Sequence, residues 1–307
     1  MSIYMQVATR LPLSHEIPAL RQIWEAVFGG KDAKLFFDHF FDPQMCLVVA
    51  EKNDPVAMGF IFPVGSIASC GQTVPCAMIY AIATKAEFRK KGFGSAVTNE
   101  LISIGHASGY PAVVLCPSDD SLFQYYCTHT PLRDWFFACE SQIEKESLPE
   151  KESILSPLHM NEISANEYRR LRKSLLADIP HIDISARVIE YQRMLCGEFG
   201  GGLFRIDETD GVSCAAIEIA ADGIGHIKEL LTTSGSMSGA LLSISSRFPA
   251  KSYIVRTPAP IKPGSVRHLS SSASSLPRRF GMLAAKDGLL QVENKLHYMP
   301  WYGLAFD

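Results

Sequence analysis

Apolar residues recur along the first half of the chain in two spacings, one typical of helices and one typical of strands. Intervals of three and four predict a helix over 17–28, which ends at Gly29-Gly30, and an aromatic-rich helix over 35–41. Compact apolar runs bounded by turn residues predict strands over 45–50, 56–64, 76–83 and 112–116, with a further helix that starts at Phe93. The first half therefore contains two helices, three successive strands, a helix and a fourth strand.

A similar order follows after a change in composition. Residues 141–157, SQIEKESLPEKESILSP, alternate charges with serine and proline, which indicates an exposed connection or an edge strand. The later spacing predicts helices over 165–176 and 184–196, strands over 202–206, 212–220 and 226–232, a helix over 239–248 and a strand over 251–256. Because the order strand-strand-strand-helix-strand repeats that of residues 45–116, we interpret it as an internal duplication. The serine-rich residues 257–280 are predicted to form a long irregular loop.

The stretch Cys76–Asn99, CAMIYAIATKAEFRKKGFGSAVTN, joins a predicted strand to a predicted helix through a basic turn. Two glycines, Gly92 and Gly94, allow the backbone of the turn to approach a ligand closely. The first N–H groups of the following helix and the positive end of its dipole favour phosphate or pyrophosphate. An alternative interpretation is a tight turn with a solvated basic face, and R-x-x-G-x-G alone does not decide between the two.

The flanking residues support the phosphate-binding interpretation. R-x-x-G-x-G between a strand and a helix resembles the acyl-CoA pyrophosphate loop of the GCN5-related N-acetyltransferases (GNAT). The lead-in Ala83-Thr84-Lys85-Ala86-Glu87-Phe88-Arg89 resembles that of the enhanced-intracellular-survival branch, although Ala86 stands where that branch usually has proline. The phosphate loops G-x-x-x-x-G-K-[ST] and G-x-G-x-x-G are both absent from this stretch.

This resemblance implies acetyl-CoA as co-substrate and assigns its contacts. Pantetheine would pair with the strand before the loop, and pyrophosphate would lie on the loop and the helix start. The implied cofactor-binding residues are Ile82, Ala83, Thr84, Arg89, Lys90, Lys91, Gly92, Phe93, Gly94 and Ser95.

A second GNAT signature resembles the segment Leu115–Tyr126, in which a strand is followed by a helix with an aromatic pair. On that alignment Tyr126 is the general acid that protonates the thiolate. The usual Gly-Phe or Gly-Tyr continuation is replaced by Cys127-Thr128-His129-Thr130, so Phe123 takes the tyrosine's place if the alignment slips by one turn. The alternative for Tyr126 is an aromatic residue packed in the core, and Tyr125 is the next candidate for the acid.

No carboxylate or histidine falls on the predicted strand 76–83, so the general base must come from elsewhere. In the enhanced-intracellular-survival branch the terminal carboxylate assists in removing the proton of the amine. The resemblance therefore makes the α-carboxylate or side chain of Asp307 a candidate base. The alternative is that the apolar run 301–307 only completes the second domain as an edge strand.

The fold class implied is α/β with a mixed sheet, built from tandem GNAT-like units of which the second is degenerate. Residues 233–238 of the second unit have no Arg or Lys, so we expect them not to bind CoA. The predicted domains are a catalytic domain over 1–142, a linker or edge segment over 143–158 and a degenerate domain over 159–307.

Composition narrows the functional classes. The 307 residues are 47% apolar and carry a net charge of −3, which gives no general reason to expect a nucleic-acid partner. Neither a signal sequence nor an apolar run long enough to span a membrane is present, so we expect a cytosolic protein. Eight scattered cysteines without C-x-x-C pairs predict free thiols and no metal site.

The leading hypothesis is an N-acetyltransferase that acts by direct attack of a primary amine of a small molecule or peptide. The rival is a non-catalytic acyl-CoA-binding module. A triphosphate-binding protein is disfavoured because no Lys-Ser/Thr pair follows the loop. The sequence specifies neither the acceptor nor the oligomeric state.

Overall fold

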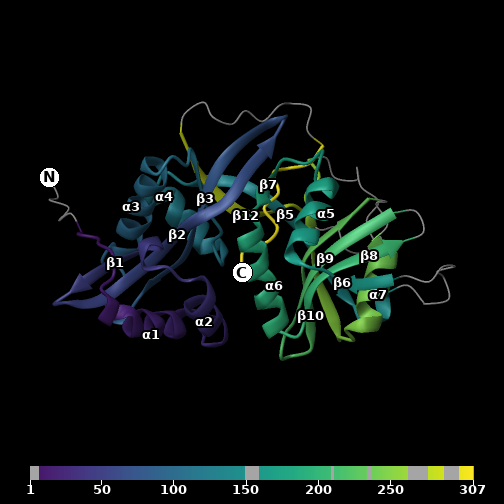
Figure 1. Cartoon of the computed structure of the whole chain (residues 1–307), viewed down its shortest axis with the longest axis horizontal. Coiled ribbons are helices and arrows are strands. Elements are labelled where there is room, and N and C mark those ends of the chain that lie inside the picture. Colours follow the sequence, from purple (N-terminus) through teal and green to yellow (C-terminus); the bar gives the residue numbers. More distant parts are fainter. Residues whose placement is uncertain are drawn as a thin grey trace. The chain divides into compact units, whose positions relative to one another are not determined.

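The computed structural model describes residues 7–148, 159–208, 211–233, 237–261, 276–286 and 297–306. The chain divides into two compact units, each assembled from segments that are distant in sequence (Figure 1). Unit 1 comprises residues 1–65, 74–134 and 281–290, and unit 2 comprises residues 66–73, 135–280 and 291–307. The domain boundaries predicted at 142 and 158 stay a prediction. In the structure the chain passes from unit 1 to unit 2 after Asp134, and each unit also includes segments from elsewhere in the sequence.

Unit 1 contains a mixed sheet in the order β1-β2-β3-β4-β12. Strands β1 and β2 pair antiparallel, β3 and β4 pair parallel, and β4 and β12 pair antiparallel. The turn between β1 and β2 has positive φ at Lys52 (51°) and Asn53 (69°), as tight hairpin turns require. The strands are β1 (Cys46–Glu51), β2 (Asp54–Ser69), β3 (Gln72–Thr84), β4 (Ala112–Leu115) and β12 (Arg278–Ala285).

Helices cover both faces of the unit 1 sheet, with α1 and α2 on one face and α3 and α4 on the other (Figure 1). The helix predicted over 17–28 is confirmed as α1, and the helix predicted over 35–41 begins earlier, as α2, and continues through a π-helical turn at Phe36–Phe40. The bounds are α1 (Ile17–Phe28), α2 (Lys31–Leu35), α3 (Phe93–Ala107) and α4 (Asp120–His129), with 3-10 turns at Ser14–Glu16, Pro43–Met45 and Ala86–Phe88.

Two apolar cores lie in unit 1. Aromatic side chains of α1 and the π-helical turn pack on β2 and β3, with the Trp24 and Phe36 rings stacked at 4.5 Å. The other core joins α3 and α4 to the opposite face and includes Phe93, Val97 and Tyr126. Since side chains alternate along a strand, Tyr80 of β3 contacts the aromatic core while Ile79 contacts the core under α3.

Unit 2 contains strands in the order β5-β11-β10-β9-β8-β6. Helix α7 packs on one face through the core that includes Leu241 and Ile244, and α5 and α6 lie on the other side (Figure 1). The bounds are β5 (Arg133–Glu144), β6 (His159–Glu162), β7 (His181–Ile184), β8 (Gly202–Glu208), β9 (Gly211–Ile219), β10 (Ile224–Thr232), β11 (Ser252–Pro258), α5 (Ala165–Leu175), α6 (Ala186–Glu198) and α7 (Met237–Arg247), with a 3-10 turn at Lys145–Ser147.

The element order predicted for the second half is present. Strands β8 and β9, and β9 and β10, pair antiparallel, and α7 connects β10 to the parallel strand β11. In unit 1, α3 likewise connects β3 to the parallel strand β4. The mixed α/β fold class is thereby confirmed, and the duplication itself stays an interpretation.

The structure refines the local predictions at several places. Residues 141–144, expected in an exposed connection or an edge strand, belong to the strand β5 and pair with β11. Residues 278–280, expected in the irregular loop, begin β12, and residues 262–275 of that loop lie outside the described residues. The short strand β7 was not predicted, because four residues give little periodicity.

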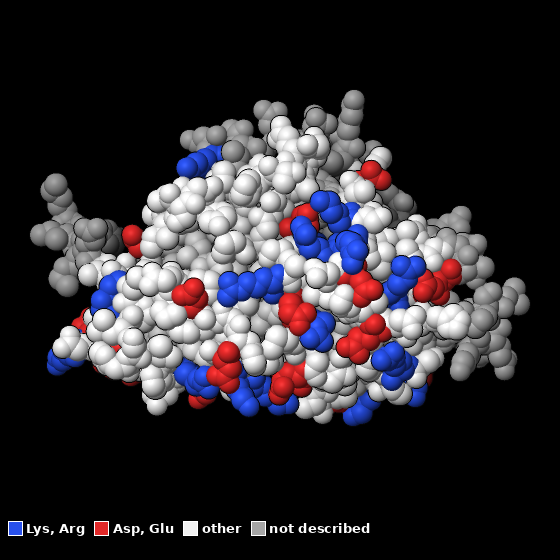
Figure 2. All heavy atoms as spheres, in the orientation of Figure 1, with Lys and Arg blue, Asp and Glu red and all other residues white. Residues whose placement is uncertain are grey.

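Other properties of the described residues bear on the expected class. None of their helices is both long and apolar enough to cross a bilayer, and they include no cluster of His, Cys, Asp or Glu suited to a metal ion. All eight cysteines have free thiols. On the face shown in Figure 2, acidic and basic side chains are interspersed.

Candidate functional site

The end of strand β3 extends beyond its neighbour. The parallel ladder between β3 and β4 runs from Cys76↔Ala112 to Ile79↔Leu115, where β4 ends, whereas β3 continues to Thr84. Within this extension Ala81 has a φ of 50°, which is unusual for a residue with a side chain and re-aims the backbone of the strand. The backbone from Tyr80 to Thr84 is therefore in a position to pair with an extended ligand.

The turn after β3 leads into the N-terminus of α3. Lys90 and Gly92 both have positive φ, 64° and 82°, and Gly92 is the N-cap residue of the helix. No side chain caps this end, so the N–H groups of Phe93, Gly94 and Ser95 have no partner within the helix. Uncapped N–H groups and the helix dipole make this turn suitable for an anion.

The basic side chains predicted at the loop are exposed. The Arg89 Nε donates to the Thr84 carbonyl at 3.3 Å, and the Lys91 ammonium lies 4.6 Å from the centre of the Phe88 ring. The Ser95 hydroxyl donates to the Gly92 carbonyl at 2.9 Å. The loop thus places positive charge beside the uncapped helix end.

Several predicted cofactor-binding residues meet at Gly94. A Cβ at this position would lie 3.3 Å from the Tyr125 hydroxyl, 3.8 Å from Ile82 Cγ2 and 3.9 Å from Thr84 Oγ1. With glycine at this position, the end of β3, the start of α3 and helix α4 lie close together with no side chain between them. Ala83 and Phe93, by contrast, are buried, so their contribution to a ligand is limited to backbone groups.

Tyr126 lies on the inner face of α4, which begins at the N-cap Asp119. Its side chain is buried in the core of unit 1, together with Phe123 one turn earlier. Burial, assisted by the neighbouring Tyr125 and Asp119, raises the pKa of Tyr126 well above its ordinary value. A phenol that stays protonated is able to donate a proton, and Phe123, which shares the same face, has no proton to give.

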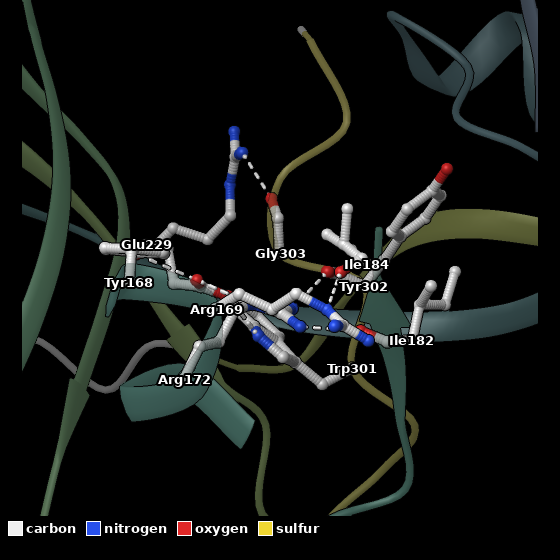
Figure 3. A network of polar contacts seen from close by, with 10 residues as sticks. Tyr168, Arg169, Arg172, Ile182, Ile184, Glu229, Trp301, Tyr302 and Gly303 are labelled. Atoms are coloured by element: carbon white, nitrogen blue, oxygen red, sulfur yellow. Dashed lines mark hydrogen bonds and ion pairs between the residues drawn. The ribbon is translucent and has the colours of Figure 1, made fainter. Parts of the chain in front are cut away.

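The C-terminal segment is fixed in unit 2 by a buried polar network (Figure 3). Arg172 of α5 donates to both carboxylate oxygens of Glu229 at 2.9 and 3.1 Å. It also donates to the carbonyls of Ile182, at 2.6 Å, and Tyr302, at 2.8 Å. The segment around Trp301 and Tyr302 is therefore held by an ion pair rather than frayed.

The Glu229 carboxylate also accepts hydrogen bonds from other side chains. The Trp301 indole N–H donates to it at 2.7 Å and the Tyr168 hydroxyl at 3.0 Å, while burial raises the pKa of Tyr168 and keeps that hydroxyl protonated. A Cβ on Gly303, which has a φ of 81°, would overlap Glu229 Oε2. The backbone thus passes so close to the carboxylate that only glycine fits. Asp307, the predicted base, lies outside the described residues.

Three features of these regions were not predicted from the sequence. The positive φ of Ala81 could not be predicted, because alanine, unlike glycine, is not typical of positions with positive φ. The Arg172–Glu229 pair joins elements 57 residues apart, so no local spacing marks it. The sequence favoured Tyr126 over Tyr125 as the general acid, but the hydroxyl that lies beside Gly94 is that of Tyr125.

Solved structures share this fold. A GCN5-related N-acetyltransferase from Kribbella flavida is 16% identical with a TM-score of 0.63, and the match covers 90% of this chain and 71% of that one. A putative acetyltransferase from Pyrococcus horikoshii is 17% identical with a TM-score of 0.59, and the match covers 98% of this chain and 96% of that one. Eis1 from Mycobacterium abscessus is 10% identical with a TM-score of 0.60, and the match covers 91% of this chain and 73% of that one. No curated protein matches the sequence.

The parallel pair β3 and β4, the uncapped helix between them and these likenesses define the fold of a GNAT acyltransferase. Residues 9–126 also match the family model described as "Acetyltransferase (GNAT) domain". Residues 9–126 of this protein therefore carry a GNAT acetyltransferase domain, which confirms the resemblance seen in R-x-x-G-x-G.

Proposed function

We propose that this protein is an N-acetyltransferase that transfers the acetyl group of acetyl-CoA to a primary amine of a small molecule or peptide. The observation that carries the proposal is the convergence, in unit 1, of the β3 extension beyond Ile79 with the uncapped N-terminus of α3. An extended amide chain that ends in a pyrophosphate matches both features.

Each part of acetyl-CoA has a partner in this proposal. Backbone groups of Ile82, Ala83 and Thr84 pair with the amides of pantetheine, as an added strand would. The N–H groups over 93–95 bind pyrophosphate, with positive charge from the side chains at 89–91. Gly94, at the start of α3, lies close to Thr84 at the end of β3, so the two parts adjoin.

The transfer step uses the protonated phenol of Tyr126. A neutral amine attacks the thioester carbonyl carbon, the C–N bond forms and the C–S bond breaks. Tyr126 gives its proton to the departing thiolate and regains one from solvent, while a base removes the extra proton of the amine. The buried Tyr126 phenol, whose pKa is raised by burial, is in the protonated form that a proton donor needs.

For the base we propose the terminal residue Asp307, through its α-carboxylate or its side chain. A protein extended by a few Gly-Ser residues tests it, since the extension displaces the terminal charge without deleting a packed side chain. Lost turnover with retained acetyl-CoA binding is expected, and full activity would rule out the α-carboxylate.

The proposed function is tested by calorimetric titration of acetyl-CoA. We expect Arg89→Glu to weaken binding at least tenfold, because a charge-assisted hydrogen bond to phosphate is worth about 1.5–3 kcal/mol. Gly94→Val is expected to weaken it likewise by filling the space beside Tyr125, with little change in the stability of the fold. Lys34→Glu, the same charge reversal at an exposed position of α2, is the control and should bind like the wild type.

Measurement of turnover distinguishes an N-acetyltransferase from a non-catalytic acyl-CoA-binding module. We expect CoA release with at least one member of a broad panel of amines, and Tyr126→Phe should lower that turnover while acetyl-CoA affinity is retained. Unchanged turnover in Tyr126→Phe would remove Tyr126 as the acid. Binding of acetyl-CoA without turnover of any amine would instead identify a non-catalytic acyl-CoA-binding module.

A further inference from the structure

The consecutive tyrosines of α4 face different surroundings. Tyr126 is buried in the core of unit 1, whereas Tyr125 is half-buried and packs only its ring against that core. The two ring centres are 5.2 Å apart, with an angle of 70° between the planes. Successive residues of a helix point about 100° apart, so the two hydroxyls cannot serve the same position.

The Tyr125 hydroxyl lies where the strand end meets the helix start. It is 3.3 Å from the place that a Cβ on Gly94 would occupy, and the same place is 3.9 Å from Thr84 Oγ1. Within the described part of the chain, the Tyr125 hydroxyl has no hydrogen-bond partner. A polar group at this point, next to the uncapped N–H groups of α3, is available to a ligand.

The ring of Tyr125 is held in place from the next turn of α4. The His129 ring stacks on it, with centres 4.8 Å apart and an angle of 30° between the planes. The His129 Nδ1 lies 2.8 Å from the Tyr125 carbonyl, and Asn99 of α3 donates to the His129 carbonyl at 2.9 Å. A hydroxyl that is already oriented loses little conformational entropy when it binds.

These contacts explain a departure from the GNAT signature. The sequence Cys127-Thr128-His129-Thr130 replaces the usual glycine and aromatic residue, and His129 is the member of it that contacts Tyr125. Tyr125 and His129 are four residues apart, the spacing at which helical side chains meet. The replacement therefore supplies a support for Tyr125.

We propose that Tyr125 is a cofactor-positioning residue whose hydroxyl donates a hydrogen bond to acetyl-CoA beside Gly94, and that His129 holds its ring. The inference rests on the proposed function, because the ligand is the acetyl-CoA of that proposal. It gives the two tyrosines separate tasks: Tyr125 contributes to binding, and Tyr126 contributes to the chemical step.

The test is calorimetric titration of acetyl-CoA into the full-length protein and its variants. We expect Tyr125→Phe to raise the dissociation constant about tenfold, which corresponds to about 1.4 kcal/mol for one hydrogen bond to a charged or strongly polar group. Tyr126→Phe removes the neighbouring hydroxyl and should leave the dissociation constant unchanged. His129→Ala should weaken binding, and His129→Phe, which keeps the stacked ring, should restore it.

A double-mutant cycle locates the contact. Gly94→Ala places a methyl group 3.3 Å from the Tyr125 hydroxyl and should weaken binding by displacing it. In the Tyr125→Phe background the hydroxyl is gone, so the same alanine should cost less and the two effects should not add.

The outcomes separate this inference from the proposed function. If the wild type does not bind acetyl-CoA, the proposed function fails. If the wild type binds it and Tyr125→Phe binds equally well, only the role of Tyr125 is overturned. Reduced turnover of Tyr125→Phe at saturating acetyl-CoA, with an unchanged dissociation constant, would also overturn it and make Tyr125 a proton donor.

Discussion

Replacing Arg172 by Met should destabilise unit 2 far more than any exposed ion pair does. The side chains of Arg172 and Glu229 are 2% and 0% exposed, so the substitution leaves a buried carboxylate without its countercharge. It also removes the donors to the carbonyls of Ile182 and Tyr302. Breaking one side of a buried pair costs about 3–5 kcal/mol, a large share of the 5–15 kcal/mol that is typical of a folded domain.

The adjacent residue provides a matched control. Lys173 pairs with Asp183 at 3.1 Å, but its side chain is 66% exposed, so Lys173→Met should cost at most about 1 kcal/mol. Urea unfolding followed by circular dichroism measures both variants. With a slope of about 2.5 kcal/mol per molar urea, Arg172→Met should move the unfolding midpoint of unit 2 down by about 1–2 M.

Hydrogen exchange assigns the effect to the C-terminal segment. The Trp301 amide donates to the Pro180 carbonyl at 2.7 Å, and the Ile182 amide donates to the Trp301 carbonyl at 3.1 Å. Both amides should exchange faster in Arg172→Met, and the double variant Arg172→Met/Glu229→Leu should recover much of the stability, because it leaves no unpaired charge. A loss in Arg172→Met no larger than that in Lys173→Met would refute the reasoning.

Two further predictions concern unit 1. The Arg10 guanidinium donates to the Glu16 carboxylate at 2.6 and 2.8 Å and holds the pKa of Glu16 below its ordinary value of 4.5. The contribution of this ion pair to stability is therefore present above pH 4.5 and is lost as the pH falls through the folded-state pKa of Glu16. Urea unfolding should therefore show a larger difference between wild type and Glu16→Gln at pH 7 than at pH 3, and an equal difference at both would contradict this cause. Gly59→Ala should lower the free energy of unfolding by about 1–3 kcal/mol, because its Cβ would overlap Ile82 Cδ1 and lie 2.8 Å from Val97 Cγ1. Gly30→Ala, whose Cβ would meet nothing within 4 Å, is the control for thermal unfolding, and equal losses in both variants would argue against the overlap.

Local patterns predicted the elements around the site because each is defined by neighbouring residues. The helix from Phe93 and the strand before the loop follow from their own periodicity, and the glycines mark the turn between them. Strand β12 was missed because its pairing with β4 joins residues about 170 positions apart. Such pairing leaves no trace in local spacing.

The inward position of Glu229 shows a second limit. Counting alternate residues from Ile227, which faces the core under α7, would put Glu229 on that same face. The register of β10 against β9 shifts between Ile227 and Glu229, and this bulge turns Glu229 to the opposite face, toward Arg172 and Tyr168. A bulge of this kind is decided by packing on both faces, which the sequence of one strand does not contain.

The central claim is that acetyl-CoA lies along the end of β3 and on the first turn of α3. Hydrogen–deuterium exchange of the full-length protein with and without acetyl-CoA tests it most directly, because the claim concerns named amides. The account predicts slower exchange for the amides over 82–84 and 93–95, with no change over β8 to β11 of unit 2. Protection confined to unit 2, or unchanged exchange over both of the named segments at saturating acetyl-CoA, would contradict it.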